Sequence, residues 1–122
     1  MTVIALIGTG RMATGLGTGW ARAGHQIVFG SRTPAEKQHL TADLPGARVT
    51  DYAGALEDAT VVVFTLPYRE VAPICRNHAA MLRERLVIDI SNPFDNLPDN
   101  RIAGTEITRD AIGLGARVVS AF

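Results

Sequence analysis

The chain opens with a short, uninterrupted apolar run, Val3 to Ile7, that ends directly in Gly8. Such a run closed by glycine is typical of a strand buried on both faces of a parallel sheet. Apolar side chains then recur at three- or four-residue steps from Arg11 to Ala23, where Gly24 follows, which predicts a helix. A buried strand that turns into a helix within three residues indicates a βα unit.

Strand and helix patterns alternate along the rest of the chain. Further strands are predicted over Gln26–Gly30, Arg48–Thr50, Thr60–Thr65, Leu86–Ile90 and Arg117–Ser120. Helices are predicted from Thr33 to about Leu44, and over Asp51–Ala59, Tyr68–Leu82 and Glu106–Ile112, with a surface loop over Asn92–Asn100.

Two of these helices carry boundary signals. Thr33 with Glu36 has the spacing of a capping box, and Thr50 or Asp51 is expected to cap the next helix. Pro73 is expected to kink the helix over Tyr68–Leu82 or to mark a late start.

This alternation predicts an α/β protein. The expected architecture is a three-layer Rossmann fold with a doubly wound, mostly parallel sheet of about six strands, formed by residues 1–122 as one domain. In such a sheet, ligands bind outside the carboxyl ends of the strands.

The amino-acid composition limits the classes of binding partner that are expected for this chain. Twelve basic residues balance twelve acidic ones without a run of one sign, so no long-range field favours nucleic acid or a membrane as a partner. Cys75 is the single cysteine, which excludes an internal disulfide, and no apolar run approaches the roughly 20 residues that span a bilayer. We therefore expect a soluble, cytoplasmic protein with a small-molecule partner.

The first βα turn has the spacing G-x-G-x-x-A. Gly8 permits a tight turn, Gly10 lets the backbone approach a phosphate because no Cβ intervenes, and Ala13 keeps the helix near the strand. The helix N-terminus then presents free N–H groups to an anion. The predicted pyrophosphate-binding residues are Gly8, Thr9, Gly10, Arg11, Met12 and Ala13. The alternative is a tight connection that binds no ligand.

A phosphate-transferring P-loop is excluded at the same turn. Gly10 and Gly15 have the Walker A spacing, but Leu16 stands where that motif requires lysine.

The end of the second strand indicates which dinucleotide binds. An NAD-binding domain places Asp or Glu there for the ribose hydroxyls, whereas this chain has Ser31, Arg32 and Thr33. Two hydroxyls and a guanidinium suit a 2′-phosphate, so NADP is favoured over NAD. The alternative is that Ser31 and Thr33 only cap the following helix while Arg32 is solvated.

Five short segments of the chain form a recognisable set: Gly8-Thr9-Gly10 with Gly15, Ala23-Gly24-His25, Gly30-Ser31-Arg32, Thr65-Leu66-Pro67-Tyr68 and Val118-Val119-Ser120-Ala121-Phe122. Together they resemble a known family, the NADP oxidoreductases that depend on the deazaflavin coenzyme F420. The resemblance covers essentially the whole chain.

The resemblance implies roles for individual residues. Thr9, Gly10, Arg11 and Met12 would cradle the pyrophosphate, Ser31 and Arg32 would hold the 2′-phosphate, and Leu66, Pro67, Tyr68, Asn92 and Pro93 would border the nicotinamide. It further implies hydride transfer between NADP and coenzyme F420, which needs orientation of two rings rather than a protein nucleophile. We therefore name no catalytic residue and no metal ligand.

Family members continue into a smaller, mostly helical part that helps form the deazaflavin pocket and the dimer. This chain is expected to lack that part, either as a fragment or as a free-standing cofactor domain, and a homodimer is compatible with it.

Two other functions stay open. One is NADP-dependent reduction of another small substrate, although the single lysine, Lys37, lies on the predicted helix after the second strand, and neither tyrosine has lysine four residues on. The other is a non-catalytic NADP-binding module. The three histidines and Cys75 are expected to be bystanders, with His25 in a turn, His39 and His78 at solvated helix positions and Cys75 buried.

Overall fold

A computed structural model of the chain describes residues 2–90, 111–113 and 117–120. The strands are β1 (Val3–Ile7), β2 (Gln26–Gly30), β3 (Arg48–Thr50), β4 (Val61–Phe64), β5 (Leu86–Asp89) and β6 (Arg117–Ser120). The helices are α1 (Arg11–Arg22), the 3₁₀ helix η1 (Pro34–Thr41), α2 (Tyr52–Glu57), α3 (Tyr68–Asn77) and α4 (Ala79–Leu82).

The six strands form one parallel sheet in the order β3-β2-β1-β4-β5-β6. The chain winds outward in one direction from β1 to β3 and in the other from β4 to β6, so the order reverses between β1 and β4. In register, Ile7 at the end of β1 lies opposite Gly30 of β2 and Phe64 of β4. The predicted Rossmann fold is confirmed, and the residues that follow these three strands leave the sheet side by side.

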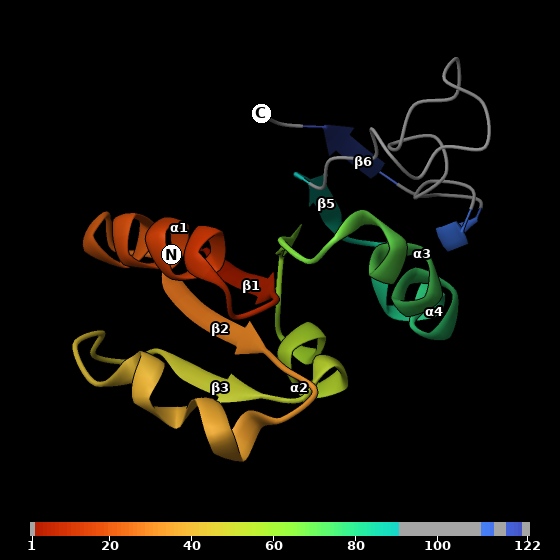
Figure 1. The fold of residues 1–122 in the computed structure, drawn as a ribbon. Helices are drawn as coiled ribbons and strands as arrows, with labels where there is room; N and C mark the ends of the chain where they lie inside the picture. The colour runs from red at the N-terminus through yellow and green to blue at the C-terminus, as the bar shows by residue number, and fades with distance from the viewer. Residues whose placement is uncertain (1, 91–110, 114–116, 121–122) are drawn as a thin grey trace.

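Helices cover both faces of the sheet, which makes the three layers (Figure 1). Ile4 and Leu6 of β1 face a core cluster that includes side chains of α1, whereas Ala5 and Ile7 face the cluster of α2, α3 and α4. This alternation along one strand explains its uninterrupted apolar sequence, since both faces of β1 are buried.

Close packing holds α1 against the sheet. A Cβ atom at Gly17 would lie 2.8 Å from Cζ of Phe29 and 3.0 Å from Cδ1 of Leu6. Ala13, one helical turn earlier, is fully buried in the same cluster. Ala13 thus makes the close helix–strand contact that was expected, and Gly17 makes another one turn later. These two small residues hold the start of α1 above the end of β1.

The segment after β2 differs from the prediction. It is a 3₁₀ helix that ends at Thr41, with no buried residue to anchor a regular α-helical stripe. The predicted capping box is wrong: Thr33 makes no side-chain cap, and the backbone N–H of Glu36 instead donates to the Thr33 carbonyl at 3.0 Å.

The helix expected over Tyr68–Leu82 is divided in two. Pro73 lies inside α3, where it removes one helical N–H donor, and the interruption comes at His78, which has φ −122° and ψ 23°. In the segment predicted as a helix over Glu106–Ile112, the structure describes residues 111 and 112, which are helical. The loop predicted over Asn92–Asn100 lies outside the described residues.

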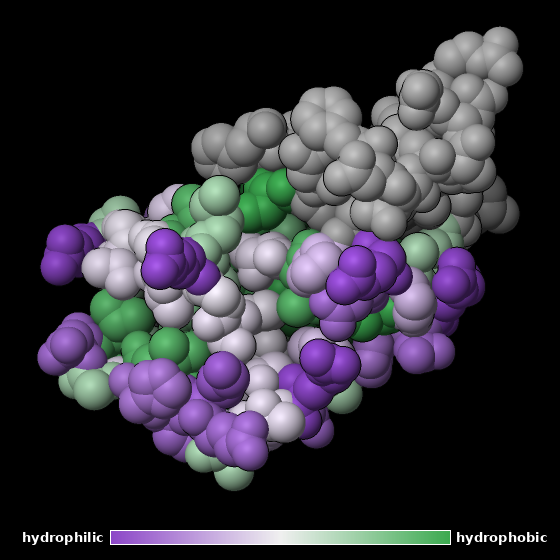
Figure 2. Space-filling view, in the orientation of Figure 1, coloured by the Kyte–Doolittle hydropathy of each residue, from purple (hydrophilic) through white to green (hydrophobic). Residues whose placement is uncertain are grey.

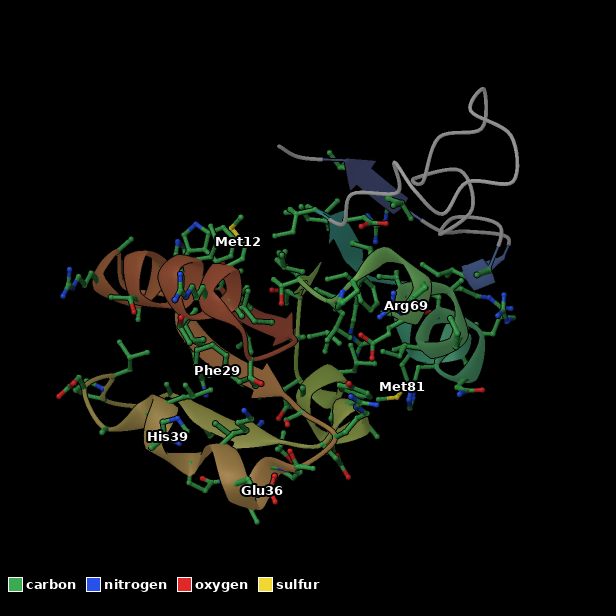
Figure 3. The ribbon with its side chains drawn as sticks, viewed as in Figure 1. Met12, Phe29, Glu36, His39, Arg69 and Met81 are labelled. Carbon is green, nitrogen blue, oxygen red and sulfur yellow. The ribbon has the colours of Figure 1, made fainter. Side chains whose placement is uncertain are left out.

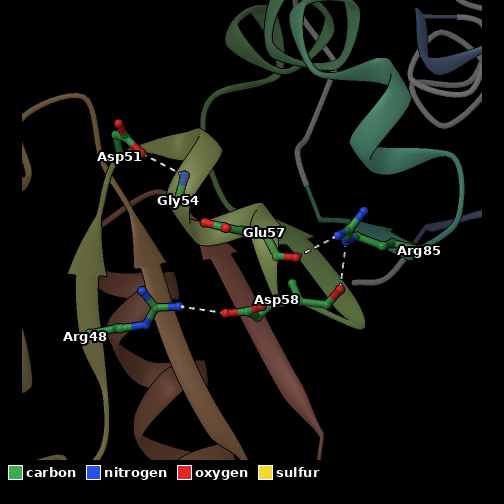
Figure 4. Close-up of polar contacts among 7 residues, drawn as sticks. Arg48, Asp51, Gly54, Glu57, Asp58 and Arg85 are labelled. Carbon is green, nitrogen blue, oxygen red and sulfur yellow. Dashed lines mark hydrogen bonds and ion pairs between the residues drawn. The ribbon is translucent and has the colours of Figure 1, made fainter.

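Arg85, directly before β5, donates to carbonyls at the ends of two helices, and Figure 4 shows its contacts at the end of α2. Its guanidinium donates to the carbonyl of Glu57 at 3.0 Å, to that of Ala59 at 2.8 Å and to that of Met81. These carbonyls lie at or just beyond the C-termini of α2 and α4, where helices leave acceptors without partners. One cation thus satisfies acceptors from both helices.

We expect Arg85→Ala to lower the free energy of unfolding by about 2 to 3 kcal/mol, because part-buried carbonyls lose charged donors. Arg48→Ala is the matched control, since within the described part of the chain the ion pair of Arg48 is an exposed one with Asp58 at 3.6 Å, and its loss should cost less than about 0.5 kcal/mol. Urea denaturation measures both. Equal losses would contradict the role assigned to Arg85.

Candidate functional site

Gly8 makes the turn out of β1 where two neighbouring strands leave no room for a side chain. Its φ is +127°, and its N–H donates to the carbonyl of Gly30 at 3.0 Å. A Cβ at this position would lie 2.3 Å from Oγ1 of Thr65, whose hydroxyl donates to the Ile7 carbonyl at 3.0 Å. The tight turn predicted for Gly8 is confirmed, and Thr65 is a part of it that the sequence did not reveal.

Gly10 is glycine for a different reason. It is the N-cap of α1 and is exposed, and a Cβ there would meet nothing within 4 Å. No side chain caps α1, and its first turn contains no acidic residue. Among the described residues, the start of this 12-residue helix thus has neither a side-chain cap nor an acidic residue in its first turn, which suits an anion bound from outside.

The residue after β2 is a buried polar one. Ser31 is 6% exposed, its N–H donates to the Thr50 carbonyl at 2.9 Å, and its Oγ accepts from the Thr33 N–H at 3.0 Å. These contacts fix the Ser31 hydroxyl at the carboxyl end of the sheet, because both its backbone and its side chain are held. The side-chain cap considered for Thr33 is absent.

A cavity of about 480 Å³ joins the glycine turn to the end of β2. Its lining comprises Gly8, Thr9, Gly30, Ser31, Arg32, Thr33, Glu36, Lys37, Tyr52 and Leu66. In Figure 2, a pale, weakly polar surface crosses the middle of the molecule, where Figure 1 places the glycine turn and the ends of β1 and β2.

Four of the lining residues were not in the predicted set: Gly30 at the end of β2, and three residues from other elements. Glu36 and Lys37 lie on η1, and Tyr52 begins α2, directly beyond β3. The sequence did contain a signal for Lys37: it follows Thr33 by four residues, the spacing that places two side chains on one face of a helix. Tyr52 depends on β3 lying next to β2, which only the strand order reveals.

A second, smaller cavity of about 220 Å³ adjoins the first and shares Arg32 and Tyr52 with it. The rest of its lining comes from α3: Arg69, Glu70, Pro73 and Ile74. Arg69 on α3 and Glu36 on η1 are labelled in Figure 3 on the two elements that flank the site.

A cation, an anion and a phenol lie among the residues that line these cavities. The Arg32 guanidinium lies 3.7 Å from the Glu70 carboxylate, and the Arg32 side chain is 76% exposed. Burial raises the pKa of the Tyr52 phenol; the nearby Arg32 cation opposes this shift and Glu70 adds to it. The phenol is therefore neutral at physiological pH.

The structure brings together only part of the predicted set. Leu66 lines the larger cavity, and Pro67, which is exposed, is the N-cap of α3. Arg11 and Met12 are exposed on α1 beside the turn, outside the cavity lining, and Ala13 is buried in the core. The backbone of Tyr68 begins α3, whereas Asn92 and Pro93 lie outside the described residues.

Other reactive groups lie elsewhere. Cys75 is fully buried, as expected, and burial together with the Asp89 carboxylate raises its pKa to about 12, so the thiol stays protonated. His39 is exposed, as predicted, but His78 is half-buried at the junction of α3 and α4.

Within residues 2–90, 111–113 and 117–120, no helix has the length and apolar character needed to cross a membrane.

The family comparison agrees with the site. A family model described as NADP oxidoreductase, coenzyme F420-dependent, matches residues 3–93. The chain belongs to this family. The predicted resemblance is confirmed, and the match includes the glycine turn, the end of β2 and the segment Leu66–Tyr68.

Solved structures share the fold. A protein from Arthrobacter sp. FB24, provisionally named an F420-dependent NADP-reductase, matches with a TM-score of 0.86 and 22% identity, over 98% of this chain and 61% of its own. A hypothetical protein from Sinorhizobium meliloti matches with a TM-score of 0.82 and 29% identity, over 100% of this chain and 62% of its own.

A curated relative extends the comparison. Glycerol-3-phosphate dehydrogenase [NAD(P)+] 2 of Lactobacillus delbrueckii subsp. bulgaricus is 24% identical over 125 residues, which cover 92% of this chain and 36% of the dehydrogenase. The chain thus spans about a third to three fifths of the length of these relatives. It is an NAD(P)-binding domain of the oxidoreductase type.

We expect Gly8→Ala to lower the free energy of unfolding by more than about 3 kcal/mol, because strain at a positive φ adds to the clash with Thr65. Gly24→Ala is the control: Gly24 has φ +97° but open space around its Cβ position, so only about 1 to 2 kcal/mol should be lost. Thermal or urea unfolding measures the pair. A Gly8→Ala loss no larger than the Gly24→Ala loss would refute the close approach to Thr65.

Proposed function

We propose that the chain binds NADP(H) along the carboxyl ends of β1, β2 and β4. The pyrophosphate would lie on Gly8, Thr9, Gly10, Arg11, Met12 and Ala13; the 2′-phosphate on Ser31, Arg32 and Thr33; and the nicotinamide beside Leu66, Pro67, Tyr68, Asn92 and Pro93. The observation that carries the proposal is the single 480 Å³ cavity that runs from the glycine turn to Arg32. The Cβ-free, uncapped start of α1 fits a pyrophosphate.

The preference for NADP over NAD rests on the residues after β2. The buried Ser31 hydroxyl can donate to a phosphate, and Arg32 offers paired N–H donors. Lys37 adds a second cation to the lining of the same cavity. No carboxylate occupies the position just after β2 where an NAD-binding domain holds the ribose hydroxyls.

The smaller cavity suits the adenine ring. Pro73 and Ile74 supply apolar contacts from α3, and the Tyr52 ring and the Arg32 guanidinium line the cavity from the side of the sheet. Adenine there would leave the 2′-phosphate within the larger cavity, since the two cavities share Arg32 and Tyr52.

We further propose that the bound nucleotide exchanges a hydride with coenzyme F420, as the family description implies. NADP(H) supplies the hydride chemistry when bound, and the residues of this chain bind and orient it. Reduction of another small substrate is the second candidate, because glycerol-3-phosphate dehydrogenase is also a relative.

Gly10→Ala should separate binding from folding. Gly10 has φ −81°, which alanine adopts readily, and its Cβ would meet no atom of the described residues within 4 Å, so stability should change by less than about 1 kcal/mol. The new methyl would stand where the pyrophosphate approaches, so NADPH and NADH should both bind at least about tenfold more weakly. Gly19→Ala, also open but farther along α1, should leave binding unchanged. Isothermal titration calorimetry measures binding, and normal nucleotide binding by Gly10→Ala would contradict the proposal.

Arg32→Ala tests the 2′-phosphate assignment. NADPH binding should weaken by about 1.5 to 3 kcal/mol, the range for hydrogen bonds to charged groups, while NADH binding changes little. Arg22→Ala, which removes an exposed cation at the far end of α1, should affect neither nucleotide. Equal losses for NADPH and NADH would refute the assignment.

The overall function is tested by titrating the purified chain with NADPH and NADH, and then by mixing NADPH with oxidised coenzyme F420. The expected result is tighter binding of NADPH than of NADH, followed by loss of the nicotinamide absorbance when coenzyme F420 is added. Binding without hydride transfer would favour a non-catalytic module or another acceptor. Absence of binding to either nucleotide would leave the glycine turn as a tight connection only.

A further inference from the structure

Glu70 occupies an unusual place for a carboxylate. It lies in the first turn of α3 and lines the smaller cavity beside the apolar side chains of Pro73 and Ile74, with its side chain only 30% exposed. Among the described residues, the polar partner of this carboxylate is Arg32, at 3.7 Å. A mostly buried anion is thus held next to the cation that we assign to the 2′-phosphate.

A helix-stabilising role explains only part of this arrangement. An acidic residue in the first turn of a helix interacts favourably with the helix dipole. That interaction does not require the carboxylate to reach across the cavity toward β2. The helix dipole also does not explain why Arg32 lies beside Glu70, since the Arg32 side chain is 76% exposed and could extend into solvent instead.

The arrangement places Arg32 between two anions once NADP(H) is bound. One is the 2′-phosphate in the larger cavity and the other is Glu70 in the smaller one, with Arg32 lining both. Donors of the guanidinium that face Glu70 are less available to the phosphate, because the carboxylate and the phosphate share one cation. NADH lacks the 2′-phosphate and would not meet this competition.

We propose that Glu70 is a specificity-determining residue that restrains NADPH affinity by competing with the 2′-phosphate for Arg32. The proposal rests on the proposed binding of NADP(H). The strength of NADPH binding is then set by α3 as well as by the strand β2 that carries the phosphate site. The effect is a smaller preference for NADPH over NADH than Ser31, Arg32 and Lys37 would give alone.

The test is Glu70→Gln, which keeps the size of the side chain and removes its charge. Calorimetry should show NADPH bound about two- to fivefold more tightly than by the wild type, with NADH changed by less than about 1.5-fold. In an Arg32→Ala background, the same substitution should give no gain, because the competition acts through Arg32. Glu84→Gln removes an equal charge at an exposed position near the opposite edge of the sheet and should leave both nucleotides unchanged.

The outcomes separate this proposal from the one on which it rests. If the wild type binds neither nucleotide, the proposed function fails and this proposal fails with it. If the wild type binds NADPH but Glu70→Gln binds it equally or more weakly, the competition is overturned and NADP binding stands. A gain that persists without Arg32, or that Glu84→Gln reproduces, also overturns it, since the effect would then be direct repulsion or net charge. Unfolding curves for each variant show whether the fold is intact.

Discussion

The close approach of three strand ends at Gly8 is the constraint on which the rest of the site depends. The Gly8 N–H is bonded to the carbonyl of Gly30, and the space that its Cβ would fill is taken by the hydroxyl of Thr65. Because the chain can turn there, α1 starts directly above the end of β1, and Gly17 lets the helix lie close enough to Phe29 to keep that position. The uncapped helix start therefore faces outward over the point where the strand order reverses.

Around this turn, each element contributes one part of a ligand site. The end of β2 supplies a fixed hydroxyl in Ser31 and a cation in Arg32, η1 supplies Lys37, and α3 closes the far side with apolar contacts and Glu70. The two cavities meet at Arg32 and Tyr52. Hydrogen-bond donors in one cavity and apolar contacts in the adjoining one fit a molecule that carries phosphates and a flat ring, which is why a dinucleotide phosphate is proposed.

The parts that could be predicted were those with local causes. The apolar run Val3–Ile7 predicts a buried parallel strand, and Leu86–Ile90 predicts a strand that the structure has over Leu86–Asp89. Asp51, one of the two predicted caps, caps α2 by accepting from the Gly54 N–H at 2.7 Å. Predictions of helix type and helix ends failed where contacts with the rest of the structure did not support the local sequence signal. Thr33 and Glu36 have the spacing of a capping box, yet η1 buries no residue and is a 3₁₀ helix. The interruption of the helix at His78 likewise had no sequence signal beyond Pro73, five residues earlier.

The sequence by itself determined the Rossmann fold, the glycine turn and the cluster Ser31–Thr33, because each depends on residues adjacent along the chain. Only the tertiary structure decided that Tyr52 and Glu70 join Arg32, since their meeting depends on β3 and α3 being placed beside the end of β2. It also supplied the physical reason for the two roles that the motif assigns to Gly8 and Gly10. Gly8 is required by a neighbouring side chain, whereas Gly10 leaves open space for a ligand, a difference that depends on atoms far away in the sequence.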